Sequence, residues 1–208
     1  MAKKVLILSP HTDDGELGVG GTVARLIEEG AEIYWVVFST SEESVPEGYP
    51  KDILEKEFLA AMDHLSIPTE RVRVYHFPVR HLPAHRQEIL EELVMLNRTV
   101  APDIVFAPSL HDVHQDHHTV AEEAVRAFKK TTLLGYEEPW NNLTFDNKVF
   151  FTLEERHLDL KAAAMECYES QKFRPYTGRD YLKGLARCHG VQIGKDFAEV
   201  FELVRSVL

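Results

Sequence analysis

The segment from Ser9 to Thr22, with the sequence SPHTDDGELGVGGT, constrains the fold more than any other part of the chain. It directly follows a short apolar run, Val5 to Leu8, which is typical of a buried strand. A helical pattern follows at Val23 to Glu29. We therefore expect the segment to form a loop at the carboxyl end of a strand, where open α/β sheets bind their ligands.

This segment places negative charge next to an imidazole. His11 is followed by the adjacent carboxylates of Asp13 and Asp14, and acidic groups this close repel one another unless a cation lies among them. A metal ion is therefore expected here. A dinucleotide-binding loop is the alternative, but Val23 stands where that motif needs its third glycine, and the second strand ends in Ser39-Thr40 without an acidic ribose partner.

Apolar runs and helical patterns alternate along the first two-thirds of the chain. This alternation predicts an α/β fold, Rossmann-like, with a mainly parallel sheet and helices on both faces. The last third is expected to add a C-terminal helix and edge strands, with the edge strand at 198–204. The 208 residues contain no repeat or linker, so we expect a single domain, residues 1–208.

Charge and cysteine content exclude several kinds of partner. The chain has 23 basic and 34 acidic residues and a net charge of −11, which disfavours nucleic acid and anionic membrane surfaces. No apolar run is long enough for membrane insertion or for a secretory signal. Its two cysteines, Cys167 and Cys188, fit a reducing compartment. We expect a cytoplasmic protein that binds a small molecule.

A second group of histidines follows the predicted strand at 103–108. His114 and His117 stand three residues apart at the start of a predicted helix, so both imidazoles lie on one side of a turn. If this strand neighbours the first one, the two loops converge and offer two imidazoles and a carboxylate. Three nitrogen and oxygen ligands with an open position for water are how catalytic zinc is held. The two loops together predict a metal site for zinc or another divalent ion.

The segment from His11 to Thr22 and the later Asp-Val-His-Gln-Asp-His at 112–117 resemble the two motifs of the zinc-dependent N-deacetylases called the LmbE-like or PIG-L family. A weaker match runs from Lys161 through Ser170-Gln171. The resemblance implies a hydrolase that removes the acetyl group from an N-acetylated amino sugar or glycoconjugate, and a homo-oligomer. It also implies that zinc is bound by His11, Asp14 and His117, that Asp13 is the general base, and that His114, oriented by Asp116, stabilises the tetrahedral intermediate.

Two other functions remain open. One is a metal-dependent hydrolase of a different amide or an ester, and the other is a non-catalytic domain that binds metal or carbohydrate. The chain also departs from the family's pattern at Thr12, Leu54 and Val79-Arg80, so sugar recognition is expected from other loops. The candidates are Arg80, His81, His85 and Arg86, or Tyr136, Trp140, Asn141 and Asn142. Of these, Arg80, Trp140 and Asn141 are the predicted substrate contacts. The loop near Arg174 and Arg179 is a further candidate for an anionic substituent, with a surface role as the default.

Overall fold

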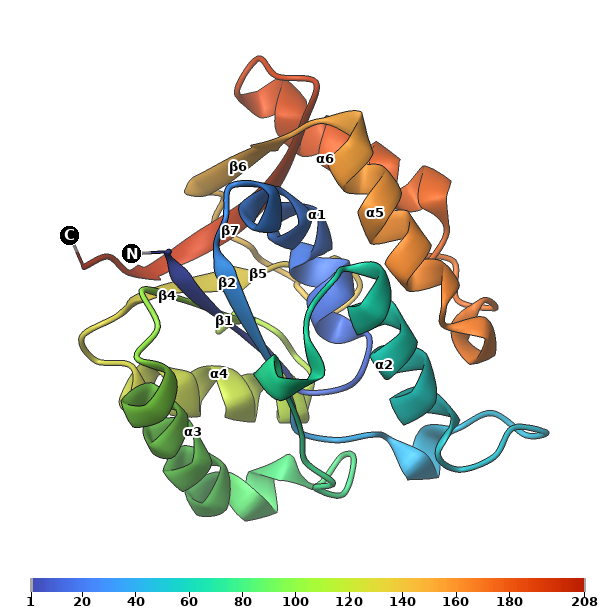
Figure 1. The fold of residues 1–208 in the computed structure, drawn as a ribbon, viewed down its shortest axis with the longest axis vertical. Helices are drawn as coiled ribbons and strands as arrows, with labels where there is room; N and C mark the ends of the chain where they lie inside the picture. The colour runs from blue at the N-terminus through green and yellow to red at the C-terminus, as the bar shows by residue number, and fades with distance from the viewer. Residues whose placement is uncertain (1, 208) are drawn as a thin grey trace.

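The computed structural model describes residues 2–207, which form a seven-stranded sheet flanked by helices (Figure 1). The strand order is β3-β2-β1-β4-β5-β7-β6. Strands β1 to β5 are parallel, and β7 is antiparallel to both β5 and β6. The predicted α/β fold is confirmed. The strands are β1 (Lys4–Ser9), β2 (Glu32–Val37), β3 (Val72–Val74), β4 (Ile104–Pro108), β5 (Thr132–Tyr136), β6 (Val149–Leu153) and β7 (Phe197–Arg205).

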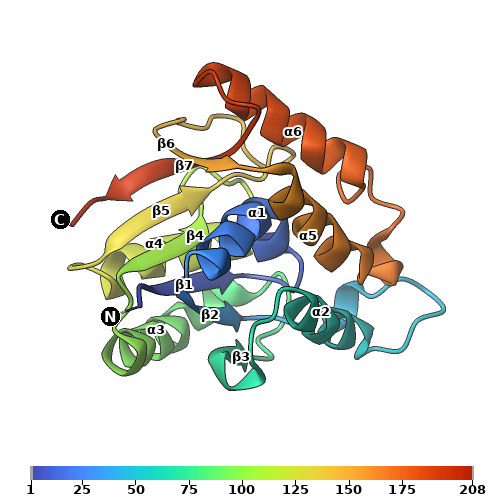
Figure 2. The same ribbon diagram turned by 45° about the horizontal axis from the view of Figure 1, so that its top comes forward.

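Helices cover both faces of the sheet, with α1, α2 and α5 on one side and α3 and α4 on the other (Figure 2). Successive residues of a strand point to opposite faces. Val5 and Ile7 therefore pack in the core with α1, α2 and α5, whereas Leu6 and Leu8 pack with α3 and α4. The helices are α1 (Asp14–Glu28), α2 (Ile53–His64), α3 (Arg86–Val100), α4 (Gln115–Ala127), α5 (Glu155–Glu166) and α6 (Arg179–Gln192).

The strand order reverses between β1 and β4. Strands β2 and β3 lie on one side of this point, and β5 lies on the other. The connections after β1 and β4 therefore leave the sheet in opposite directions and open a crevice at its carboxyl edge. The two sequence motifs follow these two neighbouring strands.

The glycine-rich segment is not a loop, contrary to the prediction. Helix α1 begins at Asp14 and contains these glycines. They permit close approach: a Cβ on Gly18 would lie 2.7 Å from Tyr136 Cγ, and one on Gly21 would lie 2.7 Å from Leu153 Cδ1. Each glycine in a helix costs about 1 kcal/mol of helix stability. The four glycines in this segment therefore argued against a helix, and the sequence pattern did not indicate the start of α1.

A buried ion pair holds α1 in place. Lys161 Nζ lies 2.6 Å from Glu199 Oε1 and donates to the Leu17 carbonyl at 2.6 Å. Glu199 also accepts the N–H groups of Gly21 at 3.0 Å and Thr22 at 2.6 Å. Lys161, which begins the weaker third match, therefore supports the helix that carries the acidic pair.

The last strand lies inside the sheet, contrary to the prediction, because β7 pairs with β5 on one side and β6 on the other. The alternating sequence, which includes Glu199 and Glu202, indicates an edge strand. Both carboxylates are buried with partners: Glu199 pairs with Lys161, and Glu202 accepts the Ser109 hydroxyl at 2.7 Å.

Candidate metal centre and active site

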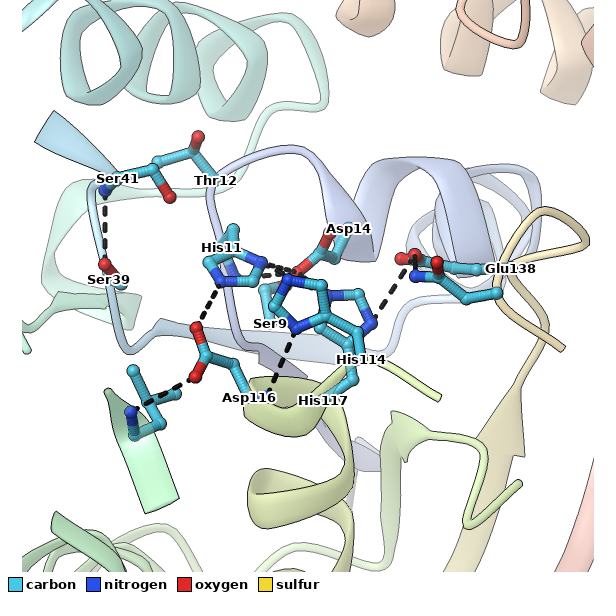
Figure 3. Close-up of polar contacts among 12 residues, drawn as sticks. Ser9, His11, Thr12, Asp14, Ser39, Ser41, His114, Asp116, His117 and Glu138 are labelled. Carbon is cyan, nitrogen blue, oxygen red and sulfur yellow. Dashed lines mark hydrogen bonds and ion pairs between the residues drawn. The ribbon is translucent and has the colours of Figure 1, made fainter. Parts of the chain in front are cut away.

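The side chains of the site come from the carboxyl ends of β1 and β4. His11 precedes α1, Asp13 is the residue before its first turn, and Asp14 is its first residue. After β4, His114 caps α4 and His117 lies in the first turn. Figure 3 shows the three imidazoles gathered beside Asp14, where the two connections meet.

Three of these side chains bring one ligand atom each to a common position. His11 Nδ1 lies 3.1 Å from His117 Nε2 and 3.1 Å from Asp14 Oδ2, and the last two atoms lie 3.2 Å apart. Metal bonds of about 2.0–2.2 Å at angles near 100° separate neighbouring ligand atoms by about 3.1–3.4 Å. The three atoms therefore fit one face of the coordination sphere of a single divalent ion.

The far nitrogen of each of these two imidazoles faces a carboxylate. His11 Nε2 lies 3.0 Å from Asp116 Oδ2, and His117 Nδ1 lies 2.8 Å from Asp112 Oδ2. A proton on each of these nitrogens leaves a lone pair on His11 Nδ1 and on His117 Nε2, the two atoms that meet. Carboxylates behind metal-binding histidines orient the rings in this way.

The carboxylate of Asp116 contacts His11 rather than His114. It also accepts the backbone N–H groups of Arg80 at 2.6 Å and Leu82 at 3.1 Å. Asp116 reaches His114 through its backbone, whose N–H donates to His114 Nδ1 at 3.2 Å. Helix geometry explains this. His114 is the N-cap of α4, and its side chain accepts the amide hydrogen of the residue two positions later. The side chains of residues two positions apart in a helix do not face each other.

His114 lies beside the three ligand atoms, with its ring centroid 4.5 Å from that of His117 and 5.0 Å from that of His11. Burial and then the charges of His117 and His11 lower the pKa of His114 to about 4. Because Nδ1 accepts an amide hydrogen, the neutral ring carries its proton on Nε2. His114 can therefore donate a hydrogen bond at neutral pH.

Asp13 and Asp14 have different surroundings. Burial would raise the pKa of Asp14, but the charges of His117 and His11 outweigh it and hold that pKa well below its usual range. Burial and the neighbouring Asp14 raise the pKa of Asp13, while Arg174 and His11 act in the opposite direction. Asp13 makes no capping hydrogen bond to α1 and lines the cavity, so its carboxylate is available for proton transfer.

A cavity of about 190 Å³ opens over the site. Trp140 and Asn141, two predicted substrate contacts, line it. The ring of Trp140 stacks on Tyr176, with the centroids 3.7 Å apart. One wall of the cavity is therefore aromatic, and the candidate metal ligands His11, Asp14 and His117 also line it.

Arg80, the third predicted substrate contact, does not line the cavity. Its amide is held by Asp116 and its φ is +69°, which turns the side chain toward the Glu43 carbonyl at 3.5 Å and the Ser44 hydroxyl at 3.3 Å. Among the other candidates, Tyr136 is buried and donates its hydroxyl to the Leu8 carbonyl at 3.0 Å. The residues His81, His85, Arg86 and Asn142 are likewise outside the cavity lining.

Glu138 is a cavity residue that the sequence reasoning missed. It is buried on the connection after β5, its Oε2 lies 3.5 Å from His117 Nδ1, and its Oε1 has no hydrogen-bond partner among residues 2–207. Burial and the charge of Asp14 raise the pKa of Glu138 well above its usual range. Its position follows β5, the neighbour of β4, so the rule that found the two motifs would also have found Glu138.

Gln171, Arg174 and Tyr176 also line the cavity. They belong to the connection between α5 and α6, which follows no strand, so the sheet pattern does not indicate them. Ser170 anchors this connection by donating its N–H and its hydroxyl to Glu57 at 2.9 and 2.6 Å. The Ser170-Gln171 pair therefore combines an anchor with a residue of the cavity wall.

Comparisons with known proteins show what this chain resembles. The model of the family described as PIG-L, GlcNAc-PI de-N-acetylase, matches residues 6–128, which include every predicted metal ligand. An uncharacterized deacetylase of Escherichia coli K12, YaiS, is 26% identical over 176 residues, 81% of this chain and 91% of that protein. The diacetylchitobiose deacetylase of Thermococcus kodakarensis is 23% identical over 229 residues, 99% of this chain and 84% of that protein. The crystal structure of the conserved protein TT1542 from Thermus thermophilus is 30% identical with a TM-score of 0.80, and the match covers 100% of this chain and 97% of that one.

Proposed function

The chain belongs to the PIG-L family and is an N-deacetylase, and on that premise we propose that it uses zinc to hydrolyse the acetamide of an N-acetylated amino sugar or its conjugate. The observation that carries the proposal is the meeting of His11 Nδ1, Asp14 Oδ2 and His117 Nε2 within 3.2 Å of one another. Two imidazole nitrogens and one carboxylate oxygen are a donor set of catalytic zinc sites. The name of the Thermococcus relative supports an N-acetylated sugar as the substrate.

Asp13 is the proposed general base. An ion bound by the three ligands supplies positive charge that lowers the pKa of water toward about 7 and polarises a carbonyl group. Asp13 accepts a proton from water as the water oxygen bonds to the acetamide carbon. The raised pKa of Asp13 suits a group that must take up this proton and later release it.

His114 is proposed to donate from Nε2 to the oxygen on which negative charge develops. The carbon–nitrogen bond then breaks, acetate keeps the new carbon–oxygen bond, and the nitrogen leaves as a free amine. We assign the return of the proton to Asp13. A neutral His114, whose pKa is lowered to about 4, would have to become an imidazolate to supply it. Asp116 acts in this scheme by orienting His11.

The cavity limits what the enzyme holds. At about 190 Å³, it is smaller than the roughly 300–1,000 Å³ of pockets for drug-sized ligands. We propose that it takes one amino-sugar ring against Trp140 and Asn141, with the rest of any conjugate outside.

Among residues 2–207, no helix has the length and apolar character of a membrane span. A cytoplasmic location and a homo-oligomeric state are further proposals, the latter from the family resemblance.

Two substitutions separate chemistry from metal binding. In zinc-loaded protein, Asp13→Asn is expected to retain zinc and to release acetate about 10²–10⁴-fold more slowly, because it lacks the general base. His11→Ala is expected to lose the metal itself. Asp180→Asn, an exposed aspartate of α6, is the matched control and should retain both properties.

The assay follows acetate release from N-acetylglucosamine, diacetylchitobiose and nucleotide-linked N-acetylglucosamine, with zinc content measured by mass spectrometry. Normal turnover by Asp13→Asn would show that the base is misassigned. No acetate from these sugars, together with hydrolysis of other amides or of esters, would favour the alternative hydrolase. Zinc binding with no hydrolysis of any of these compounds would favour the non-catalytic domain.

A further inference from the structure

Arg174 is the one lysine or arginine among the described residues that line the cavity. The ionisable groups that share the cavity with it include the carboxylates of Asp13, Asp14 and Glu138. The chain as a whole carries a net charge of −11. Arg174 is therefore a single guanidinium on the wall of a cavity lined by several carboxylates.

Neutral groups accept the hydrogen bonds of the Arg174 guanidinium, while the charges of Asp13 and Asp14 act on it from a distance and favour its charged form. Nε donates to Gln171 Oε1 at 2.7 Å, and Nη1 donates to the Tyr176 hydroxyl. Within the described residues, Arg174 makes no ion pair at 4.0 Å or less. By contrast, Arg179 at the start of α6 pairs with Asp159. Among residues 2–207, one hydrogen of Nη1 and both hydrogens of Nη2 have no hydrogen-bond acceptor.

The two residues that hold Arg174 are themselves fixed. Gln171 is 2% exposed and donates from Nε2 to the Ser170 hydroxyl at 3.1 Å, and Ser170 is anchored on α2. Tyr176 is stacked on Trp140 with their planes 10° apart. Arg174 is therefore oriented before any ligand arrives, which lowers the entropy lost on binding.

We propose that Arg174 binds an anionic group of the substrate, so that the enzyme acts on N-acetylated amino sugars bearing a carboxylate or phosphate remote from the acetamide. This inference rests on the proposed function. The planar fork of an arginine pairs with both oxyanions through two parallel hydrogen bonds. The competing role is electrostatic, in which Arg174 acts on Asp13 from across the cavity; the two roles predict different substrate dependence.

The test compares acetate release from N-acetylglucosamine, its 1- and 6-phosphates and N-acetylmuramic acid, which carries a carboxylate. The zinc-loaded protein is expected to prefer one of the anionic sugars. Arg174→Gln is expected to lower the ratio of its kcat/KM to that of N-acetylglucosamine by about 10–100-fold, the value of a charge-assisted pair. Arg174→Lys should recover more of the ratio for a phosphate than for the carboxylate. Arg179→Gln is the matched control and should leave the ratio unchanged.

If Arg174→Gln lowers kcat/KM equally for neutral and anionic sugars, Arg174 acts electrostatically on Asp13 or supports the structure of the loop. This result would overturn the proposal. A protein that neither prefers any of the anionic sugars as a substrate nor binds any of them more tightly than N-acetylglucosamine would also overturn it. Calorimetry with the same sugars and the zinc-loaded Asp13→Asn protein separates this inference from the proposed function. Arg174-dependent binding of an anionic sugar that wild-type protein does not deacetylate would support the anion site and contradict the deacetylation of these sugars. If Arg174→Gln fails to fold, the Lys variant provides the comparison.

Discussion

Asp13, Asp14 and Glu16 lie within one turn of chain, and their surroundings give the three carboxylates different properties. The imidazoles keep Asp14 ionised as a candidate ligand, and Asp13 lines the cavity and makes no capping hydrogen bond to α1. Glu16 is fully buried and accepts the Tyr168 hydroxyl at 2.6 Å, while its Oε2 has no partner among residues 2–207. The residue type alone does not distinguish these roles, because burial and neighbours decide the pKa of each carboxylate.

Glu16 makes the stability of the fold depend on pH. Burial raises its pKa well above the ordinary value of 4.5, and the hydrogen bond from Tyr168 opposes this only in part. A folded-state pKa above the unfolded value means that the folded protein binds the proton more tightly. The associated stability is fully present below the unfolded pKa and is lost as pH rises through the folded pKa.

Glu16→Gln removes the titration and keeps an oxygen that accepts the Tyr168 hydroxyl. The free energy of unfolding of the variant should fall less than that of the wild type between pH 5 and pH 8, so the variant gains relative stability as pH rises. Urea unfolding at each pH measures the difference, with Glu70→Gln, an exposed glutamate, as the control. Parallel pH profiles for Glu16→Gln and wild type would contradict this account of Glu16.

At the scale of elements, the mainly parallel pairing of the strands was predictable from the sequence, and the meeting of the loops after β1 and β4 was predictable if these two strands are neighbours. Apolar runs followed by polar clusters indicate both. The start of α1 was not predictable, because its glycines are selected by contact with Tyr136 and Leu153, which lie far along the chain. The internal position of β7 was not predictable either, because Glu199 is buried by its pairing with Lys161, which is distant in the sequence. Long-range partners override local propensity in both elements.

Two glycine substitutions in helices should have opposite effects on stability. Gly18→Ala in α1 places a methyl group 2.7 Å from Tyr136 Cγ, and overpacking of this kind costs about 1–3 kcal/mol. Gly184→Ala in α6 meets no atom within 4 Å and should stabilise by about 0.5–1 kcal/mol through helix propensity. Chemical unfolding of both variants measures whether each substitution lowers or raises the free energy of unfolding. Stabilisation by Gly18→Ala would show that α1 does not need a glycine at this contact.

At the scale of the whole molecule, the site brings together connections that lie far apart in the sequence. The candidate ligand atoms come from the connections after β1 and β4, and the cavity wall includes residues of the connections after β2, β3, β5 and α5 and of α2. The sequence motifs indicated the first two, on the condition that β1 and β4 are neighbours, and the observed strand order meets this condition at the point where it reverses. The sheet pattern does not indicate the connection after α5, for which the sequence favoured a surface role. The anchoring of Ser170 on Glu57 and the stacking of Tyr176 on Trp140 hold this connection at the cavity.

A crystal structure of the zinc-loaded protein, with anomalous diffraction recorded at the zinc absorption edge, tests the central claim most directly. The account predicts one strong peak within about 2.0–2.2 Å of His11 Nδ1, Asp14 Oδ2 and His117 Nε2, with the carboxylate of Asp13 outside bonding distance. A zinc ion bound instead by His114 or Glu138, or no peak between the two connections, would contradict it.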